Sequence, residues 1–386
     1  MTRIRACGGA ACVFLAAGLA DAQVSFAALQ VNAFEIVLFG RAWHVSSYFV
    51  QDDLLKNASE DTFFNPEGLA FRAGMLYASG DREADATSSR LAVYTCSAGG
   101  PLSFNGFIQM PSTSPDWWGP EGLTFNTSGT GYGGGSNELV SVERDAPSQA
   151  GVINLVSGAV SNRVATDALE DITYLPLRAQ FAVLADLGTS VRVAFCDRTM
   201  TPTGAGFAVL PGSSGLAAVS PAFGSWFTRT SQQEEILVLV TKAAPGNAVV
   251  AYDSAGLPIG PICRLPLEPK ARIPLGGGFY RLLPAFGTVE AVSVDEAGKV
   301  LFLGDEQNAM IHVLTGGRPA MDFDADGDID LTDFGTFQAC FNGPHRTPAR
   351  TGCTPADSDG DSDVDLADFG TFQSCFNGPN RPAACP

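Results

Sequence analysis

The stretch PEGLAF at residues 66–71 recurs as PEGLTF at residues 120–125. Two variants follow, LEDITY at residues 169–174 and VEAVSV at residues 289–294. Each places a glutamate before an alternating apolar segment, the pattern of a half-buried β-strand. A phrase that returns along a chain indicates that one structural unit is repeated.

The spacing of these phrases predicts the architecture. Their glutamates lie 54, 49 and then 120 residues apart, and they are Glu67, Glu121, Glu170 and Glu290. A degenerate copy near Leu216, without the leading glutamate, divides the longest interval. Units of this length with three or four short strands are typical of β-propeller blades. We therefore predict a mainly β fold, with a five- or six-bladed β-propeller over residues 23–318. Five blades can be named and the segment 34–50 is the candidate for the missing sixth, with closure of the ring together with the last blade as the other possibility. A large β-sandwich, the alternative, would not repeat a phrase at near-constant spacing.

The phrase EGL(A/T)F, followed by LY and an aspartate, resembles blades of the phytase-like and esterase-like propeller families. The resemblance covers residues 60–315 and implies a secreted, six-bladed ring. Some members hold calcium in a carboxylate-lined channel and hydrolyse phosphate esters there. Only the four repeated glutamates carry over, as channel carboxylates or as acceptors that staple neighbouring blades through backbone N–H groups. Because structure repeats in every blade and active sites rarely do, the staple role is favoured.

A second repeat follows the propeller. DFDADGDIDLTDFGTF begins at residue 322, and DSDGDSDVDLADFGTF begins at residue 357. Closely spaced carboxylates repel one another, so the pattern indicates a bound cation. An EF-type calcium loop takes oxygen ligands from positions 1, 3, 5, 7, 9 and 12. The predicted ligands of two Ca²⁺ ions, in loops 322–333 and 357–368, are Asp322, Asp324, Asp326, Asp328, Asp330, Asp333, Asp357, Asp359, Asp361, Asp363, Asp365 and Asp368.

Each loop leads into an amphipathic segment that NGP ends, and two such units over residues 321–380 resemble a type I dockerin. That family docks into cohesin modules through loop positions 10 and 11. The resemblance thus implies a cohesin-like or other surface protein as partner, bound through Leu331, Thr332, Leu366 and Ala367. It also implies main-chain ligation at position 7 and water-mediated ligation at position 9. Ser362, in place of the usual glycine at position 6, and the extra cysteines depart from the family pattern.

The N-terminal residues predict export. Residues 1–22 combine two arginines, a short apolar run and an Ala-Asp-Ala cleavage pattern, as in a signal peptide. We expect a secreted or cell-surface protein without membrane insertion of the mature chain. The net charge of −18 disfavours nucleic acid as a partner. An oxidising compartment permits disulfides among the four cysteines of the tail, whose connectivity stays open.

Three functions remain open at this level. The first is a secreted calcium-binding protein that displays a propeller through a docking tail. The second is a secreted hydrolase, either a phytase-like phosphoesterase or a glycoside-degrading enzyme. The third is a structural envelope or matrix protein. No catalytic constellation is evident in the sequence, so the first is favoured, and a carbohydrate or phosphorylated ligand of the propeller stays open.

Overall fold

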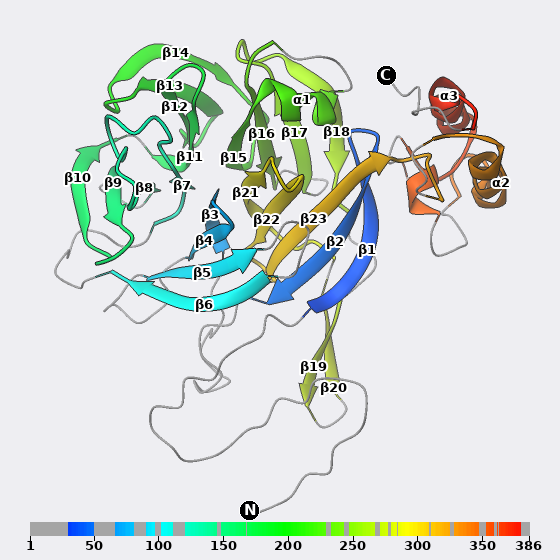
Figure 1. Ribbon diagram of the computed structural model, residues 1–386, viewed down its shortest axis with the longest axis horizontal. Coiled ribbons are helices and arrows are strands. Elements are labelled where there is room, and N and C mark those ends of the chain that lie inside the picture. The colour runs from blue at the N-terminus through cyan, green and yellow to red at the C-terminus, as the bar shows by residue number, and fades with distance from the viewer. Residues whose placement is uncertain are drawn as a thin grey trace, which may run out of the picture.

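The chain folds into a ring of β-sheets followed by a short region with two helices (Figure 1). The structure is a computed structural model. It describes residues 30–49, 66–80, 90–96, 102–110, 120–144, 148–166, 168–228, 233–242, 247–266, 271–276, 279–283, 285–308, 310–324, 328–346, 353–358, 361 and 363–379. The predicted signal peptide, residues 1–22, lies outside the described residues. No described helix is both long enough and apolar enough to cross a bilayer.

Four blades are antiparallel sheets of four consecutive strands. Blade 1 comprises β3 (Pro66–Arg72), β4 (Met75–Gly80), β5 (Arg90–Cys96) and β6 (Leu102–Gln109). Blade 2 comprises β7 (Leu123–Thr124), β8 (Glu138–Glu143), β9 (Gln149–Asn154) and β10 (Val160–Ala165). Blade 3 comprises β11 (Leu169–Leu175), β12 (Gln180–Asp186), β13 (Val191–Asp197) and β14 (Pro202–Ala208). Blade 4 comprises β15 (Ser213–Val219), β16 (Ile236–Thr241), β17 (Ala248–Tyr252) and β18 (Pro258–Arg264), with α1 (Pro221–Thr228) after β15.

The fifth blade joins the two ends of the propeller. Its order is β21 (Val289–Asp295), β22 (Val300–Asp305), β23 (Met310–Pro319), β2 (Arg41–Phe49) and β1 (Gln30–Leu38). The ring therefore has five blades, and the N-terminal strands add to the last blade. Strands β19 (Ala271–Gly276) and β20 (Phe279–Leu283) form a separate two-stranded ribbon, which extends away from the ring in Figure 1.

The repeated phrases occupy the innermost strand of each blade. Strand β3 lies beside β7, and the contacts continue through β11, β15 and β21 back to β3. One apolar cluster fills each of the five gaps between adjacent blades. In β16, for example, Leu237 and Leu239 pack toward blade 3, whereas Val238 and Val240 pack toward blade 5. This burial on both faces explains why ILVLV, at residues 236–240, is continuously apolar.

The C-terminal region has its own small core. It contains α2 (Leu331–Cys340), the 3₁₀ turn η1 (Thr354–Ala356) and α3 (Leu366–Cys375). Phe337 and Phe372 are buried there with Ile329 and Val364. The region lies beside the outer strands of blade 5 in Figure 1, and η1 contacts β1.

Candidate functional site

The position-12 aspartates organise both acidic loops. Asp333 accepts hydrogen bonds from the backbone N–H of Phe323 at 2.6 Å and of Asp330 at 2.9 Å. Asp368 repeats this arrangement, accepting from the N–H of Ser358 at 2.6 Å and of Asp365 at 2.8 Å. One side chain therefore joins the beginning and the end of each loop.

The position-9 aspartates begin the two helices. Asp330 is the N-cap of α2 and accepts from the Thr332 N–H, and Asp365 caps α3 through the Ala367 N–H. In each helix the position-12 aspartate completes a capping box, since its carboxylate accepts from the N-cap backbone. The same carboxylates thus set the loop and the helix that follows it.

The two loop–helix units hold each other reciprocally. The carbonyl of Val364, at position 8 of the second loop, accepts from the N–H groups of Asn342 and Gly343 after α2. The carbonyl of Ile329, at position 8 of the first loop, accepts from Asn377 and Gly378 after α3. Each position-8 residue is therefore linked to the segment that ends the helix of the other unit.

Carboxylates converge in both loops. Among the residues that the structure describes, ligand atoms within 4.8 Å of one another form three groups, and these are Asp322 with Asp324 and Asp333, Asp328 with Asp330 and Asp333, and Asp363 with Asp365 and Asp368. Asp326 and Asp359 lie outside the described residues, and the side chains of Asp357 and Asp361 belong to none of these groups. Oxygen-only donor sets of this kind suit a hard divalent cation such as calcium.

The aspartates at position 7 of the two loops contribute side-chain oxygens to these carboxylate groups. Asp328 and Asp363 are buried, with 6% and 2% of their surfaces exposed. Asp363 Oδ2 accepts from the His345 N–H, while Asp363 Oδ1 is buried without a hydrogen-bond partner among the described residues. A buried carboxylate oxygen in this state is costly unless a cation or a donor reaches it.

The predicted docking residues lie on the surface. Leu331 is 72% exposed and Leu366 is 73% exposed, at equivalent positions of the two helices. Thr332 and Ala367 are exposed beside them. Large apolar side chains at such exposure mark a candidate interaction surface.

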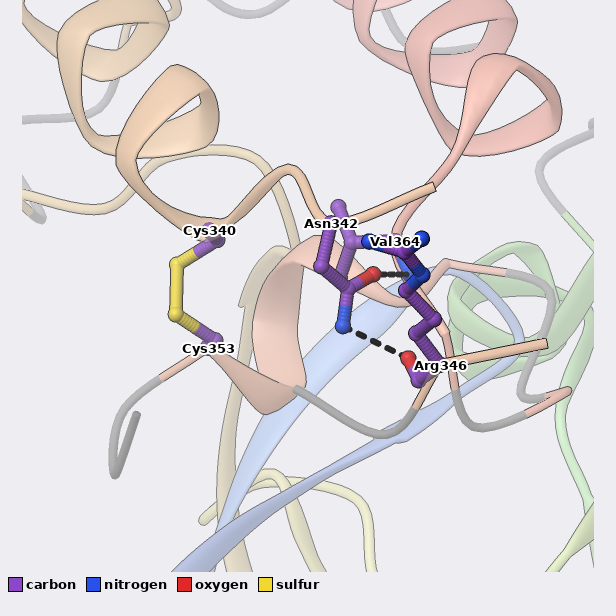
Figure 2. Close-up of a disulfide and its surroundings, with 5 residues drawn as sticks. All are labelled: Cys340, Asn342, Arg346, Cys353 and Val364. Carbon is purple, nitrogen blue, oxygen red and sulfur yellow. Dashed lines mark hydrogen bonds between the residues drawn. A yellow bond between two sulfur atoms is a disulfide. The ribbon is translucent and has the colours of Figure 1, made fainter. Parts of the chain in front are cut away.

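A disulfide links the two units of the region (Figure 2). Cys340, at the end of α2, is bonded to Cys353, just before η1. Beside it, Asn342 accepts from the Val364 N–H at 3.0 Å and donates to the Arg346 carbonyl at 2.6 Å (Figure 2). Cys375 is disulfide-bonded as well, and Cys385 lies outside the described residues. The three propeller cysteines are buried thiols, and they are Cys96, Cys196 and Cys263.

A second charged cluster lies at the channel mouth where the innermost strands begin. Glu170 forms an ion pair with Arg144 at 3.0 Å, and Glu290 pairs with Lys242. Glu121 lies close enough to Arg144 to affect its pKa. Burial raises the pKa of Glu170, although the charges of Arg144 and Lys242 act in the opposite direction. The structure thus brings three of the four predicted glutamates to one cluster. Glu67, the second residue of β3, is half-buried.

Bonds between adjacent innermost strands are made by hydroxyl groups. Three serine or threonine oxygens accept from the backbone of the next blade. They are Thr124 from the Tyr174 N–H, Thr173 from the Ala218 N–H and Ser293 from the Phe71 N–H. Each hydroxyl stands three residues after a repeated glutamate. Asp171 adds a fourth bond, accepting from the Leu216 N–H at 2.6 Å.

A cavity of about 310 Å³ lies toward the other end of the innermost strands. Residues from all five innermost strands line it, together with two carboxylates, Glu235 and Glu296. The repeated glutamates do not line it, so the channel has two chemically different ends.

A serine, a histidine and an aspartate also meet inside blade 5. Ser47 Oγ lies 2.8 Å from His312 Nδ1, and Asp305 Oδ2 lies 3.1 Å from His312 Nε2. All three are at most 2% exposed, and Phe286 packs against the imidazole. A nucleophile must reach its substrate, so this buried set is structural.

Sequence reasoning missed Arg144, Lys242, Glu235 and Glu296. The two cations follow second strands of their blades and carry no repeated phrase. The hydroxyl acceptors did leave a signal, because EGLT, EDIT and EAVS share a serine or threonine at the same place.

No protein-family model and no curated protein matches the chain. Among solved structures it is similar to a gluconolactonase from Xanthomonas campestris, at 11% identity over 76% of this chain and 98% of that chain, with a TM-score of 0.38. It is also similar to the Pan2 WD40 domain of Neurospora crassa, at 14% identity over 75% of this chain and 89% of that chain, with a TM-score of 0.35. An auxiliary nutrient binding protein from Bacteroides ovatus shares 10% identity over 73% of this chain and 70% of that chain, with a TM-score of 0.39. Such likenesses concern the fold alone, so the site is interpreted from its own residues.

Proposed function

We propose that the chain is a secreted propeller protein that docks to a partner through a calcium-dependent, dockerin-like C-terminal module. The observation that carries this proposal is the duplicated convergence of aspartates around the buried Asp333 and Asp368. Bound calcium would turn their mutual repulsion into coordination. Asp326 and Asp359 are proposed to complete the ligand sets with Asp357 and Asp361.

The docking part of the proposal is supported by the exposed, equivalent Leu331 and Leu366. Each lies one residue after the N-cap aspartate of its helix, so the loop that would bind calcium also positions the leucine. Calcium binding and partner binding should therefore be coupled. The proposed partner is a cohesin-like module on a surface scaffold.

Calorimetric titration of the full chain with CaCl₂ tests the metal sites. We expect two calcium ions per chain in the native protein and one in either Asp333→Asn or Asp368→Asn. The control is Asp197→Asn, which makes the same change in an exposed turn of blade 3. No calcium uptake by the native chain, or equal loss in the control, would contradict the proposal.

Surface binding to immobilised cohesin modules tests the docking surface. Binding should require calcium and fall at least tenfold in Leu331→Ala/Leu366→Ala. The matched control, Gln338→Ala/Gln373→Ala, changes exposed residues at equivalent positions of the same helices. If every cohesin fails while two calcium ions bind, the cohesin partner is wrong and the calcium module stands.

The charged cluster at the channel mouth supports a second candidate function, in which the propeller itself is a hydrolase with its active site at that mouth. Glu170 combines a raised pKa with the neighbouring cation Arg144, a pairing that suits a general acid beside an anionic or polarised substrate. Hydrolysis of p-nitrophenyl phosphate or p-nitrophenyl glycosides, lost in Glu170→Gln and kept in Glu138→Gln, would support this function. No turnover of either substrate class by the native chain would exclude these activities.

A further inference from the structure

We infer that the central cavity binds a small organic cation, a primary amine on an apolar chain, through Glu235 and Glu296. This site lies apart from both the acidic loops and the cluster at the opposite channel mouth. Nothing in the proposed docking function requires it. The inference rests on the shape of the cavity, the position of the two carboxylates and the bonding of Glu235.

The two carboxylates come from different blades. Glu235 immediately precedes β16 of blade 4, and Glu296 immediately follows β21 of blade 5. Glu296 accepts from the Ser220 hydroxyl at 2.6 Å, which holds it at the rim. The charge of Glu296 acts repulsively on Glu235, while the charge of Arg178, outside the cavity, acts on Glu235 in the opposite direction. A cation between them would remove this repulsion.

Glu235 has one satisfied and one unsatisfied oxygen. Its Oε1 accepts from the Leu177 N–H at 2.9 Å. Its Oε2 is buried without a hydrogen-bond partner among the described residues, although the residue lines the cavity and is only 3% exposed. A buried acceptor of this kind requires a donor, and an ammonium group supplies three.

The remaining walls select an organic ligand rather than a bare metal ion. Most of the remaining lining residues are apolar, among them Leu69, Phe71, Phe125, Val219 and Val294, and five serines and threonines line the cavity with them. None of the described residues that line the cavity is a lysine or an arginine. Two carboxylates alone are few ligands for calcium, which takes six to eight oxygens. Aliphatic and aromatic walls instead suit the carbon chain of an amine.

The size of the cavity limits the ligand. Its volume of about 310 Å³ is at the lower end of the range for small-molecule sites. A six-carbon amine is a suitable probe. The neutral alcohol of the same length controls for burial of the apolar chain without the charge.

The experiment is calorimetric titration of the full chain with hexylamine, hexanol and CaCl₂, in separate runs. We expect saturable hexylamine binding that weakens at least tenfold in Glu235→Gln and in Glu296→Gln. The control is Glu234→Gln, because Glu234 is adjacent in sequence but 62% exposed and paired with Arg178 outside the cavity. Since Glu296 is exposed, its variant keeps the test valid if Glu235→Gln does not fold.

Three results would overturn the inference. They are hexanol binding as tightly as hexylamine, equal effects of the Glu234 and Glu235 variants, and no saturable binding of hexylamine. Calcium uptake that persists in Asp333→Asn and in Asp368→Asn but is lost in Glu235→Gln would assign the cavity to a metal ion. That result would also contradict the inference.

Discussion

At the scale of single residues, the blades are joined by hydroxyl groups that follow the repeated glutamates. Thr124, Thr173 and Ser293 each accept one N–H from the next innermost strand. Ala70 and Ala217 stand at the corresponding positions of blades 1 and 4. An innermost strand has an unpaired edge facing the channel, and these acceptors satisfy part of it.

Replacing one of these hydroxyls by a methyl group should destabilise the ring. In Thr173→Val the Ala218 N–H loses its acceptor, and we expect a loss of about 1–3 kcal/mol in the free energy of unfolding. Urea denaturation measures this loss. The control Thr127→Val alters an exposed threonine and should stay within about 0.5 kcal/mol of the native protein. Equal stabilities of the two variants would show that the hydrogen bond makes no net contribution to the free energy of unfolding.

Glu235 should make stability depend on pH in a definite direction. Burial raises the pKa of Glu235 above 4.5, against the N–H groups of Leu177 and Arg178. The folded protein therefore keeps this proton at pH values where the unfolded chain has released it. The resulting stability is fully present below pH 4.5 and is lost as the pH rises through the folded-state pKa.

Urea denaturation between pH 4.5 and pH 7 tests this sign, starting from the unfolded-state value. The native protein should lose more stability over this range than Glu235→Gln, which cannot titrate. In Glu234→Gln, the free energy of unfolding should fall with pH as steeply as in the native protein or more steeply. The reason is that hydrogen bonds from Ser254 and Arg178 lower the pKa of Glu234. A Glu235→Gln variant with the native pH profile would contradict the assignment.

These residues also mark the limit of sequence reasoning about the site. Eight of the twelve predicted aspartates converge in the three groups, and sequence reasoning could point to them because calcium loops use fixed positions within one short segment. Glu170 and Arg144 meet across two blades, and their pairing depends on the closure of the ring. Glu235 looks like an ordinary solvated charge beside Glu234, and only the packing of blades 3 and 4 buries it.

At the scale of elements, the ring closes by adding N-terminal strands to the last blade. Strand β2 pairs with β23 from Arg41 opposite Pro319 to Phe49 opposite Met310. Ser47 lies opposite His312 in this register, and their side chains bond across the junction. Trp43 and Val45 fill the gap between blades 4 and 5. The closure therefore combines backbone pairing, a buried polar link and apolar packing.

The blade count illustrates what a repeat phrase can and cannot predict. Five innermost strands were identifiable from four clear phrases and one degenerate copy. The apolar strands before the first phrase fitted either a sixth blade or a closure. Because β1 and β2 lack a phrase of their own and pair with β23, the second interpretation is confirmed.

Removing the closing strands should open the ring. A chain that begins at Val50 lacks Trp43 and Val45 and exposes the edge of β23. We expect it to lose cooperative thermal unfolding and to aggregate, as unpaired edges promote association. A chain that begins at Gln23 is the control and should unfold cooperatively. An unchanged unfolding midpoint in the shorter chain would show that the closure is dispensable.

At the scale of the whole molecule, two separate cores are joined by a short connection. Within the part of the chain that the structure describes, the tail buries its phenylalanines among themselves and shares no apolar cluster with the propeller. Contact between the two parts runs through η1 against β1 and through the Ala320 N–H, which donates to the Gly40 carbonyl. Loss of the tail's structure should therefore leave the ring intact.

Calcium removal tests this independence with a signal specific to each part. All four tryptophans and all seven tyrosines precede residue 321, so intrinsic fluorescence reports on the propeller alone. EDTA should reduce the helical circular dichroism of α2 and α3, because loops without metal cannot hold their carboxylates together. Fluorescence should not change. A loss of both signals together would mean that the two parts unfold as one unit.

The Cys340–Cys353 disulfide should set how much calcium the tail needs. It closes a loop of 13 residues, which contributes about 3 kcal/mol by restricting the unfolded chain. Each factor of ten in an equilibrium constant corresponds to about 1.4 kcal/mol. Shared between two calcium ions, the loss in Cys340→Ser/Cys353→Ser should raise the calcium midpoint of helix formation about tenfold. Circular dichroism during a calcium titration measures this midpoint, with Cys196→Ser, a free buried cysteine of the propeller, as the control. If the double variant and the control fold at the same calcium concentration as the native chain, calcium alone organises the tail and the disulfide adds nothing to its folding.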